Sequence, residues 1–364
     1  MENNPKSLYV HIPFCSHICE YCDFTKLFYN QKFIEPYLKA LFSEIDSYNI
    51  DKYDTIYVGG GTPTSLCDDD FEILLKKLKP LLNENGEFSV EANVENLSLE
   101  KLLIMKKYGV NRLSIGVEST NDKRLKEIGR HHSFLDAVKA VSLAKENGFN
   151  NINVDLIYGF KGETISDLKD DLKNILALET SHISIYSLII EKGSMLFNKG
   201  YKEQNEDDSR LYYETILKTL RENGYTRYEV SNFAKEGKYS RHNLTYWKDN
   251  EYVGVGLGAS GYVHNVRYTN TKNLSKYISG EFIAEQEFID KNKELEDYLL
   301  CNLRLEEGFS RKDFLLRFNE DFVDMFSSKL VSLTKSNLLL IYDDKIKLTD
   351  EGILLLDFVL EKLL

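Results

Sequence analysis

Strand-like and helix-like segments alternate six times over the first half of the chain, and this alternation restricts the possible folds more than any other feature. Six β-α units in a row predict a parallel sheet, because each helix carries the chain back to the start of the next strand. The regular spacing favours an open or partial barrel over a doubly wound sheet. We therefore predict an α/β fold with a partial, TIM-like (β/α)6 barrel. Its strands are expected at Ser7–Ile12, Asp54–Val58, Glu87–Ala92, Arg112–Val117, Asn151–Ile157 and His182–Leu188.

The segments between these strands have the periodicity of amphipathic helices, with apolar residues three or four positions apart. Ser98 and Ser133 are typical helix-capping residues, and Gly109 and Gly148 mark expected helix ends. The expected core-facing positions are Phe33, Tyr37, Leu41 and Ile45 in one segment and Leu135, Val138, Val141 and Leu143 in another.

A change of texture after the sixth unit divides the chain into three predicted parts. Residues 1–235 form the barrel, and residues 236–288 add short strands and a connecting segment. Residues 289–364 have the pattern of helices followed by a hairpin, which indicates a small helical, winged-helix-like module. Modules of this kind often bind DNA, but residues 290–364 carry 8 Lys and 3 Arg against 9 Asp and 7 Glu. This acidic balance argues against a DNA-binding role.

Composition limits the classes of partner further. The 46 Lys and Arg against 58 Asp and Glu give a net charge of −12, which disfavours nucleic acid or an anionic membrane as the main partner. No run approaches the roughly 18 apolar residues of a membrane span, and the amino-terminal residues lack the apolar region of a signal peptide. We expect a cytoplasmic protein whose five cysteines are reduced rather than paired as disulfides.

Three of these cysteines, Cys15, Cys19 and Cys22, lie within eight residues directly after the first predicted strand. A loop at the carboxyl end of a strand can gather three thiolates where α/β proteins bind ligands. Structural zinc would need a fourth ligand, such as His11 or His17. A redox pair would use Cys19 and Cys22 and leave Cys15 idle. An iron–sulfur cluster on three cysteines would keep one iron free for another ligand. The spacing favours such a cluster modestly and does not exclude the zinc site or the redox pair.

The spacing C-x3-C-x2-C after a first strand resembles the signature of the radical S-adenosylmethionine superfamily. The string YVHIPFCSHICEYCDF resembles, more narrowly, the oxygen-independent coproporphyrinogen III oxidase branch. The oxidases have a fourth cysteine two positions after the third, whereas this chain has Phe24; its Cys-Asp-Phe ending is similar to the HemW group, regarded as haem chaperones. Many matching strings in order make the resemblance specific. They are GGGTPT, NRLSIGVES, LKEIGRHH, NVDLIYG, HISIYSL, YEVSNFA, RHNLTYW and NLRLEEG.

The resemblance implies a 4Fe-4S cluster, with Cys15, Cys19 and Cys22 on one iron each and S-adenosylmethionine on the fourth. In catalytic members the cluster and this ligand supply the radical chemistry, and the protein holds and shields them. The residues expected to contact S-adenosylmethionine are Tyr9, Tyr21, Gly59, Gly60, Gly61, Thr62, Glu91, Glu118, Arg130 and Asp155.

These implied contacts have ordinary structural alternatives. A glycine run after a strand is often only a tight turn, and Glu91 and Asp155 could be strand-end carboxylates that cap a helix. Among the implied roles, Arg130 would pair with the ligand carboxylate through its planar fork. Glu118 departs from the oxidases, which carry Gln at that position, and so adds a negative charge beside the expected ligand.

His242 lies in the string HNLTYW, which is similar to a motif of the HemW group proposed for haem contact. Imidazole is a common axial ligand of haem iron. The alternative is that Tyr246 and Trp247 are core aromatics whose polar atoms are satisfied inside the protein. His11, just before the cysteines, is expected to orient their loop by hydrogen bonding.

The sequence therefore carries two main functional hypotheses. The first is a chaperone that binds haem and passes it to an acceptor protein, membrane-associated or not, with an electron donor for the cluster. The second is a radical oxidase that decarboxylates coproporphyrinogen III or another tetrapyrrole. Phe24 at the position of the fourth cysteine favours the chaperone. A zinc-stabilised binding protein without a cluster is a third and weaker hypothesis.

Overall fold

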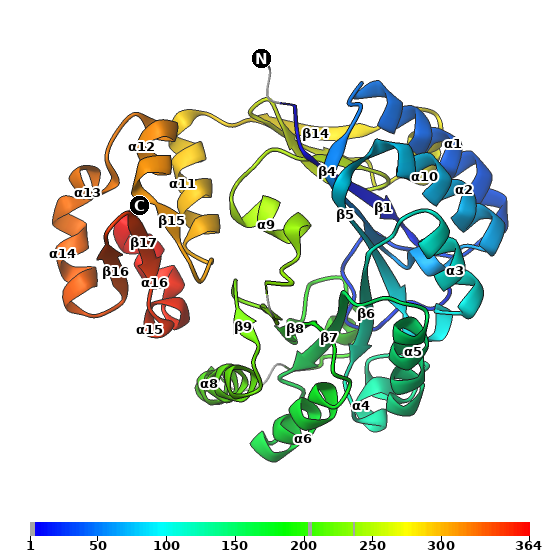
Figure 1. Cartoon of the computed structure of the whole chain (residues 1–364), viewed down its shortest axis with the longest axis horizontal. Coiled ribbons are helices and arrows are strands. Elements are labelled where there is room, and N and C mark those ends of the chain that lie inside the picture. The colour runs from blue at the N-terminus through cyan, green and yellow to red at the C-terminus, as the bar shows by residue number, and fades with distance from the viewer. Residues whose placement is uncertain (1–3, 203–205, 236) are drawn as a thin grey trace.

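The computed structural model describes residues 4–202, 206–235 and 237–364. Its main sheet curves without closing, so that each of the two edge strands has a neighbour on one side only (Figure 1). Seven strands run parallel, and the two at one edge are antiparallel additions. The predicted α/β fold with an open, partial barrel is confirmed. The spatial order is β11 (Val253–Val255), β1 (Ser7–Ile12), β4 (Tyr53–Gly60), β5 (Leu82–Asn93), β6 (Arg112–Glu118), β7 (Ile152–Tyr158), β8 (His182–Ser187), β10 (Asn232–Ala234) and β9 (Thr226–Arg227).

Helices cover the convex face of this sheet (Figure 1). Two of them begin with a capping box, in which Ser133 or Thr164 and the acidic residue three positions later satisfy each other's backbone N–H groups. The helices of this region are α1 (Gln31–Ser47), α2 (Asp68–Leu78), α3 (Leu99–Lys107), α4 (Asp122–Glu127), α5 (Phe134–Glu146), α6 (Ile165–Leu176), α7 (Met195–Asn198) and α8 (Glu206–Glu222), with short 3-10 turns at Pro63–Ser65, Lys79–Leu81 and Val94–Asn96.

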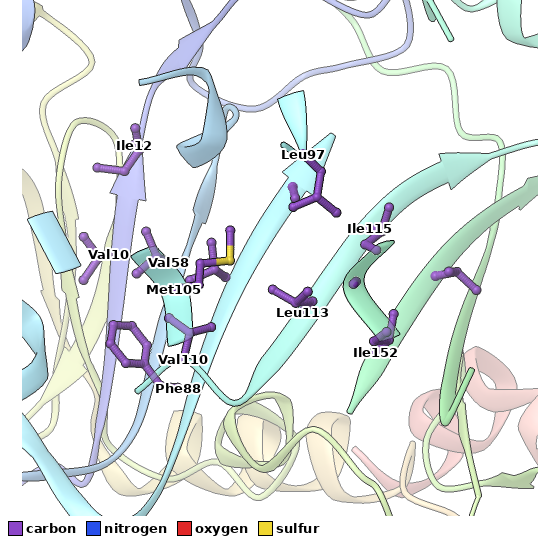
Figure 2. Close-up of a cluster of buried hydrophobic side chains, with 14 of the residues drawn as sticks. Val10, Ile12, Val58, Phe88, Leu97, Met105, Val110, Leu113, Ile115 and Ile152 are labelled. Atoms are coloured by element: carbon purple, nitrogen blue, oxygen red, sulfur yellow. The ribbon is translucent and has the colours of Figure 1, made fainter. Parts of the chain in front are cut away.

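The core lies between the sheet and these helices. Figure 2 shows strand residues such as Val10, Val58 and Leu113 packed together with Met105 of α3 and the nearby Val110. All five side chains are at most 3% exposed. Burial of this apolar surface is the main force that holds the helices against the sheet.

Alternation along the strands places polar side chains on the opposite, concave face. In β6, Leu113 and Ile115 belong to the core. Arg112, Ser114 and Glu118 alternate with them and therefore point to the other side of the sheet. Buried polar residues are unusual, so their presence on the concave face indicates that the functional site lies on this side of the sheet.

Residues 237–288 contribute one strand to the main sheet and form a second, separate sheet. Their strand β11 pairs in parallel with β1, with Tyr9 opposite Gly254. The helix α9 (Arg241–Trp247) lies beside the concave face, between the sheet and the carboxyl-terminal region (Figure 1). The other elements are β12 (Ser260–Val263), β13 (Val266–Asn270) and β14 (Ile283–Phe288), which form a separate antiparallel sheet, and α10 (Leu274–Ile278); near the amino terminus, β2 (Phe14–Cys15) pairs with β3 (Leu27–Phe28).

The carboxyl-terminal residues form a helical region with a hairpin and a hydrophobic core of their own. Figure 1 places it beside α9, away from the convex helices. Its small sheet has the order β15-β17-β16. The elements are α11 (Lys291–Asn302), β15 (Phe309–Ser310), α12 (Arg311–Phe318), α13 (Phe322–Met325), α14 (Ser327–Lys335), β16 (Leu339–Tyr342), β17 (Lys345–Leu348), α15 (Asp350–Leu354) and α16 (Leu356–Leu363). Within the described ranges, no helix combines the length and apolar character needed to cross a membrane.

Candidate functional site

A cavity of about 450 Å³ lies where the parallel strands end on the concave face. This volume falls in the ordinary range for small-molecule sites. The cavity gathers residues from the loop after β1 and from strands β4 to β8, which are far apart in sequence. Its polar and thiol-bearing lining includes Cys15, Cys19, Cys22, Tyr21, Thr62, Glu91, Arg112, Glu118, Arg130 and Asp155.

The cysteine loop, residues 15–22, is held by segments that come much later in the chain. The backbone N–H of Glu20 donates to the carbonyl of Ile128 (2.9 Å), and the N–H of Leu196 donates to the carbonyl of Glu20 (3.0 Å). The Glu20 carboxylate also pairs with Lys199 at 2.6 Å. The loop that carries the three thiols is therefore fixed by the end of α4 and by α7.

Burial raises the pKa of all three thiols, that of Cys15 to about 11. The thiols are therefore protonated at neutral pH, and binding of a metal group must release protons. In the described ranges no three His, Cys, Asp or Glu side chains converge as a single metal ion would require. A cluster that takes one thiolate on each of three irons does not need such convergence.

The glycine run after β4 lets the backbone approach this loop. A Cβ atom added at Gly61 would lie 2.9 Å from the Cys15 Sγ and 2.8 Å from the Pro13 carbonyl carbon. Gly60 has a φ of 111°, a conformation that other residues rarely adopt. Thr62 donates from its hydroxyl to the Cys15 Sγ (3.6 Å). Glycine is thus required here by the cysteine loop as well as by the turn.

Glu91, at the end of β5, is tied to the glycine run. Its carboxylate accepts from the Tyr57 hydroxyl (2.7 Å) and from the Gly60 N–H (3.1 Å). Burial raises the pKa of this carboxyl group, although both hydrogen bonds act in the opposite direction. Glu91 lines the cavity and so lies where a ligand's ammonium or hydroxyl group could meet it.

Arg130 is committed to groups of the protein itself. It forms a buried ion pair with Glu118, donates to the Asn93 side-chain oxygen (2.7 Å) and donates to the Tyr21 hydroxyl (3.0 Å). Glu118 reaches it from a backbone with a φ of 67°, next to a register shift between β6 and β7. The extra negative charge noted in the sequence therefore neutralises the guanidinium group that was expected to take the ligand carboxylate.

Asp155 lines the same cavity from β7. Its carboxylate accepts from the Asn153 amide (2.8 Å) and from the Ser114 hydroxyl (3.4 Å). Burial, followed by repulsion from Glu118, raises the pKa of Asp155 to about 7. This carboxyl group can therefore exchange a proton or a hydrogen bond with a ligand near neutral pH.

Two of the implied contacts do not line the cavity. Tyr9 is directed to His11, whose Nδ1 lies 2.9 Å from the Tyr9 hydroxyl, and Gly59 packs against the Glu91 carboxylate. His11 in turn bonds through Nε2 to the carbonyl of Thr25 (2.7 Å). Tyr9 and Gly59 thus lie behind the residues that face the cavity. His11 thus contacts the segment that follows the cysteine loop, and its expected role in orienting that loop stays a prediction.

His242 is not placed to bind haem in this structure. It is 1% exposed, its Nδ1 lies 2.8 Å from the Thr55 hydroxyl, and its Nε2 lies 2.7 Å from the Tyr246 hydroxyl. Burial lowers the pKa of the ring to about 3, so it is neutral. With both nitrogens engaged, the geometry supports an internal, hydrogen-bonded role for His242 and Tyr246 and not the expectation that His242 is a haem ligand.

Several cavity residues were not predicted from the sequence, and Asn93 and Arg112 are the two that matter most for the charge of the site. Asn93 joins Arg130 to the Thr62 hydroxyl, to which its amide donates at 3.0 Å. Arg112 lines the cavity from the first position of β6. The available signal was alternation along the strands, because Arg112 has the same parity as Glu118 and Asn93 the same parity as Glu91.

Comparison with known families gives two matches along this chain. Residues 9–175 match the Radical SAM superfamily, and residues 289–355 match the HemN C-terminal domain. The first range contains the cysteine loop and the cavity-lining ends of β4 to β7. The second covers most of the carboxyl-terminal helical region.

Curated relatives match over their whole length. The protein named heme chaperone HemW of Lactococcus lactis subsp. lactis (strain IL1403) is 38% identical over 100% of this chain and 98% of its own. The heme chaperone HemW of Bacillus subtilis (strain 168) is 37% identical over 96% of this chain and 97% of its own. Similarity of this extent includes the barrel and the carboxyl-terminal region alike.

Among solved structures, the coproporphyrinogen III oxidase (HemN) from Escherichia coli superposes with a TM-score of 0.85. The alignment covers 99% of this chain and 90% of that chain, at 22% sequence identity. At this identity the similarity establishes a shared fold. It does not carry the activity of that enzyme over to this chain.

Proposed function

Because this chain belongs to the HemW family of the radical S-adenosylmethionine superfamily, we propose that it is a haem chaperone that binds haem and delivers it to an acceptor protein. The observation that carries the proposal is the 38% identity to a heme chaperone HemW over the full length of both chains. Phe24, at the position where the oxidases have a fourth cysteine, supports the same function. It is 64% exposed and lines the cavity.

Membership of the superfamily implies a 4Fe-4S cluster and S-adenosylmethionine, and the residues present fit both groups. Three thiols line one cavity, and the glycine run that approaches Cys15 leaves no room for a larger side chain at Gly61. In this proposal Cys15, Cys19 and Cys22 hold the cluster. When bound, the cluster and its ligand supply one-electron chemistry.

The chain's own residues would position S-adenosylmethionine. Glu91 and Asp155 offer buried oxygen acceptors, and Tyr21 lies beside Arg130 on the cavity wall. Thr62 holds the Cys15 thiol through its hydroxyl. The cluster would need an electron donor and reduced cysteines, which is consistent with a cytoplasmic location.

A radical oxidase acting on coproporphyrinogen III or another tetrapyrrole is the second candidate. It is favoured by the fold shared with the coproporphyrinogen III oxidase and by cavity carboxylates at Glu91 and Asp155. It is disfavoured by Phe24 and by the charge of Glu118, since both positions depart from the oxidase pattern.

One pair of assays separates the two functions. Anaerobically reconstituted full-length protein is mixed with haem, passed through gel filtration, and then incubated with apomyoglobin as a general haem sink. We expect haem to be retained at a defined stoichiometry and then transferred. In parallel, coproporphyrinogen III is supplied with S-adenosylmethionine and a reductant, and we expect no decarboxylation.

The triple variant C15A/C19A/C22A serves as the matched control. It should lose iron and sulfide but still retain haem, because the thiols are assigned to the cluster and not to haem. Decarboxylation of coproporphyrinogen III by the parent, together with loss of haem in gel filtration, would overturn the chaperone proposal in favour of the oxidase.

A further inference from the structure

Arg112 differs from every other buried arginine in the described part of the chain. Four arginines are buried, with exposed fractions of 1% for Arg112, 8% for Arg124, 7% for Arg130 and 2% for Arg227. Removing such a charge from water is costly, and buried cations are therefore normally paired. The four arginines differ in whether they contact a carboxylate.

Three of them are paired with carboxylates. Arg124 meets Glu163 at 3.0 Å, Arg130 meets Glu118, and Arg227 meets Glu306. The Arg112 side chain has no carboxylate oxygen within 4.0 Å and no hydrogen bond among the described residues. Its Nε is buried without a hydrogen-bond partner, as is the Nε of Arg130, so the missing carboxylate is what sets Arg112 apart.

The acidic groups nearest to Arg112 are already engaged. Glu87 accepts from the backbone N–H groups of Arg241 (3.0 Å) and His242 (3.1 Å). Asp155 accepts from Asn153 (2.8 Å) and Ser114 (3.4 Å). Burial lowers the pKa of Arg112, but the field of Glu87 and other neighbours outweighs burial and raises it overall. The guanidinium group is therefore charged.

Arg112 also lines the cavity that holds the three cysteines. It begins β6, whereas Glu118 ends that strand and pairs with Arg130. The cavity thus has one cation in direct contact with a carboxylate of the protein and, at the opposite end of the strand, one without such a contact. A planar fork of donors facing a cavity is suited to a carboxylate.

We propose that Arg112 is a receptor for a ligand carboxylate, forming a subsite at the end of the cavity remote from Glu118. Two ligands of this protein carry carboxylates: S-adenosylmethionine through its amino acid group and haem through its propionates. The haem source rests on the proposed function, whereas the S-adenosylmethionine source rests only on the family. The shared chemistry is an anionic carboxylate that reaches the unpaired guanidinium group.

The test compares each ligand with a version that lacks the carboxylate charge. Haem is compared with haem dimethyl ester by absorbance titration, and S-adenosylmethionine with decarboxylated S-adenosylmethionine by equilibrium dialysis. Both pairs are measured on the full-length parent, on R112Q and on R112K. The parent should prefer at least one acid form, and R112Q should reduce that preference by about tenfold or more, the contribution of a charged hydrogen-bonded pair. R112K, which keeps the charge but loses the fork, should lie between them.

The pair of ligands whose preference changes identifies the source of the carboxylate. If R112Q leaves the preference in both pairs unchanged, the proposal is wrong, even though both acid ligands still bind; failure of the parent to bind haem at all would instead count against the proposed function. Should R112Q not fold, the parent alone decides: equal binding of acid and neutral forms in both pairs overturns the subsite, and a preference that R112K lowers supports it.

Stability provides a second readout that a merely structural role would not share. Removing Arg112 breaks no ion pair, so ligand-free R112Q should lose less stability than a variant in which a buried ion pair is broken. A matched control, R124Q, leaves Glu163 and Asp171 without their shared cation and should unfold earlier. A large loss of stability in R112Q, with carboxylate preference unaltered, would assign Arg112 to the fold alone.

Discussion

Glu118 sets the electrostatics of the cavity at the level of a single residue. Its backbone adopts the left-handed region, with a φ of 67°, which costs a non-glycine residue on the order of 1 kcal/mol or more. A register shift at the end of β6 accompanies this conformation, and such irregularities commonly redirect side chains near functional sites. The result is a carboxylate aimed at Arg130.

We therefore predict that E118Q binds S-adenosylmethionine more tightly. The amide keeps a hydrogen bond to Arg130 and removes a negative charge from the cavity wall, which favours a ligand carboxylate at either cavity arginine and should raise the affinity roughly threefold to tenfold. Equilibrium dialysis of the ligand with parent and variant measures the change. E72Q removes an equal charge from a surface pair with Lys107 and should have no effect. Weaker binding by E118Q than by the parent would contradict the assignment.

His242 is held on both sides of its ring, by Thr55 and Tyr246. H242A should therefore lower the free energy of unfolding by about 2–4 kcal/mol, since it leaves a cavity and takes the hydrogen-bond partner from the Tyr246 hydroxyl, while Thr55 still donates to Ser7 (2.9 Å). Y246F, which removes one of the two hydrogen bonds, should cost only about 1 kcal/mol. Urea denaturation gives both values, and haem titration of folded H242A should match the parent. A lost haem spectrum in folded H242A would restore the residue as a ligand.

At the scale of elements, strand positions were easier to predict than helix faces. Each of the six strands expected from the sequence is present, because buried parallel strands are short apolar runs. In α1, Tyr37, Leu41 and Ile45 are buried as expected, but Phe33 is 43% exposed. The sequence pattern marks a stripe of apolar residues without saying where along the helix the sheet ends.

The helix α5 shows why large apolar residues can mislead. Of the four residues expected in the core, Val141 is buried and Val138 and Leu143 are partly buried against it, but Leu135 is 61% exposed. The buried face is completed by Ala137, Ala140 and Ala144. Small side chains allow a helix to pack closely on its neighbours, and periodicity weighted by hydrophobicity overlooks them. The wrong placement of Leu135 affects which side chains pack against the sheet, but not the presence of the helix.

Glu44 joins three elements through one buried carboxyl group. From α1 it accepts hydrogen bonds from the Gly256 N–H after β11 (2.9 Å), from Asn270 of β13 and from Tyr277 of α10. Burial raises the pKa of Glu44 to about 7. Since the folded state holds this proton more tightly than the unfolded state does, the stabilisation is present below about pH 4.5 and is lost as the pH rises toward 7.

We predict that E44Q removes this pH dependence. The amide places an N–H group among donors, so the variant carries a constant penalty, but it has no proton to lose. The parent should therefore lose stability relative to E44Q between about pH 4.5 and 7, and the difference should be constant above that range. Urea denaturation at half-unit pH steps measures it. Parallel profiles for the two proteins would show that Glu44 ionises as freely in the folded state as in the unfolded one.

At the scale of the whole molecule, two of the hydrophobic cores meet at a junction that also carries ion pairs. Tyr213 of α8 packs against both cores. Arg227 of β9 donates to the Tyr213 hydroxyl (3.1 Å) and pairs with Glu306 and Asp350 of the carboxyl-terminal region. The ion pairs of Arg227 therefore contribute to the attachment of the carboxyl-terminal region, alongside Arg210–Glu351 and Arg221–Asp350.

R227Q should therefore weaken the attachment of the carboxyl-terminal region while leaving both cores intact. The single tryptophan, Trp247, lies 5.9 Å from the Arg304 guanidinium group across this junction, so its fluorescence reports separation. We expect its transition in guanidinium chloride to move to a lower concentration than the loss of helical signal. R311Q, whose partner Asp321 lies within the same region, should leave the tryptophan transition in place. Coincident transitions in R227Q would contradict this division.

The fold and the cysteine loop could be predicted from the sequence, because both depend on short, contiguous strings. The pairing of Arg130 with Glu118 and the lack of a carboxylate partner at Arg112 could not be predicted. Both depend on which side chains the curved sheet brings together across 12 residues or more. His242 illustrates the same limit. A motif fixed its identity, whereas its two hydroxyl partners come from β4 and from the other end of α9.

The way the cysteine loop is anchored also bears on how the protein is made. Its thiols leave the ribosome among the first residues, but the backbone partners of Glu20 lie at Ile128 and Leu196. At about 5–20 residues per second, the ribosome needs roughly ten to forty seconds to supply the second of them. During that interval the three cysteines are part of a nascent segment without its final shape. Cluster insertion is therefore expected to follow translation of α7. Until then, the three thiols depend on a reducing compartment to remain unoxidised.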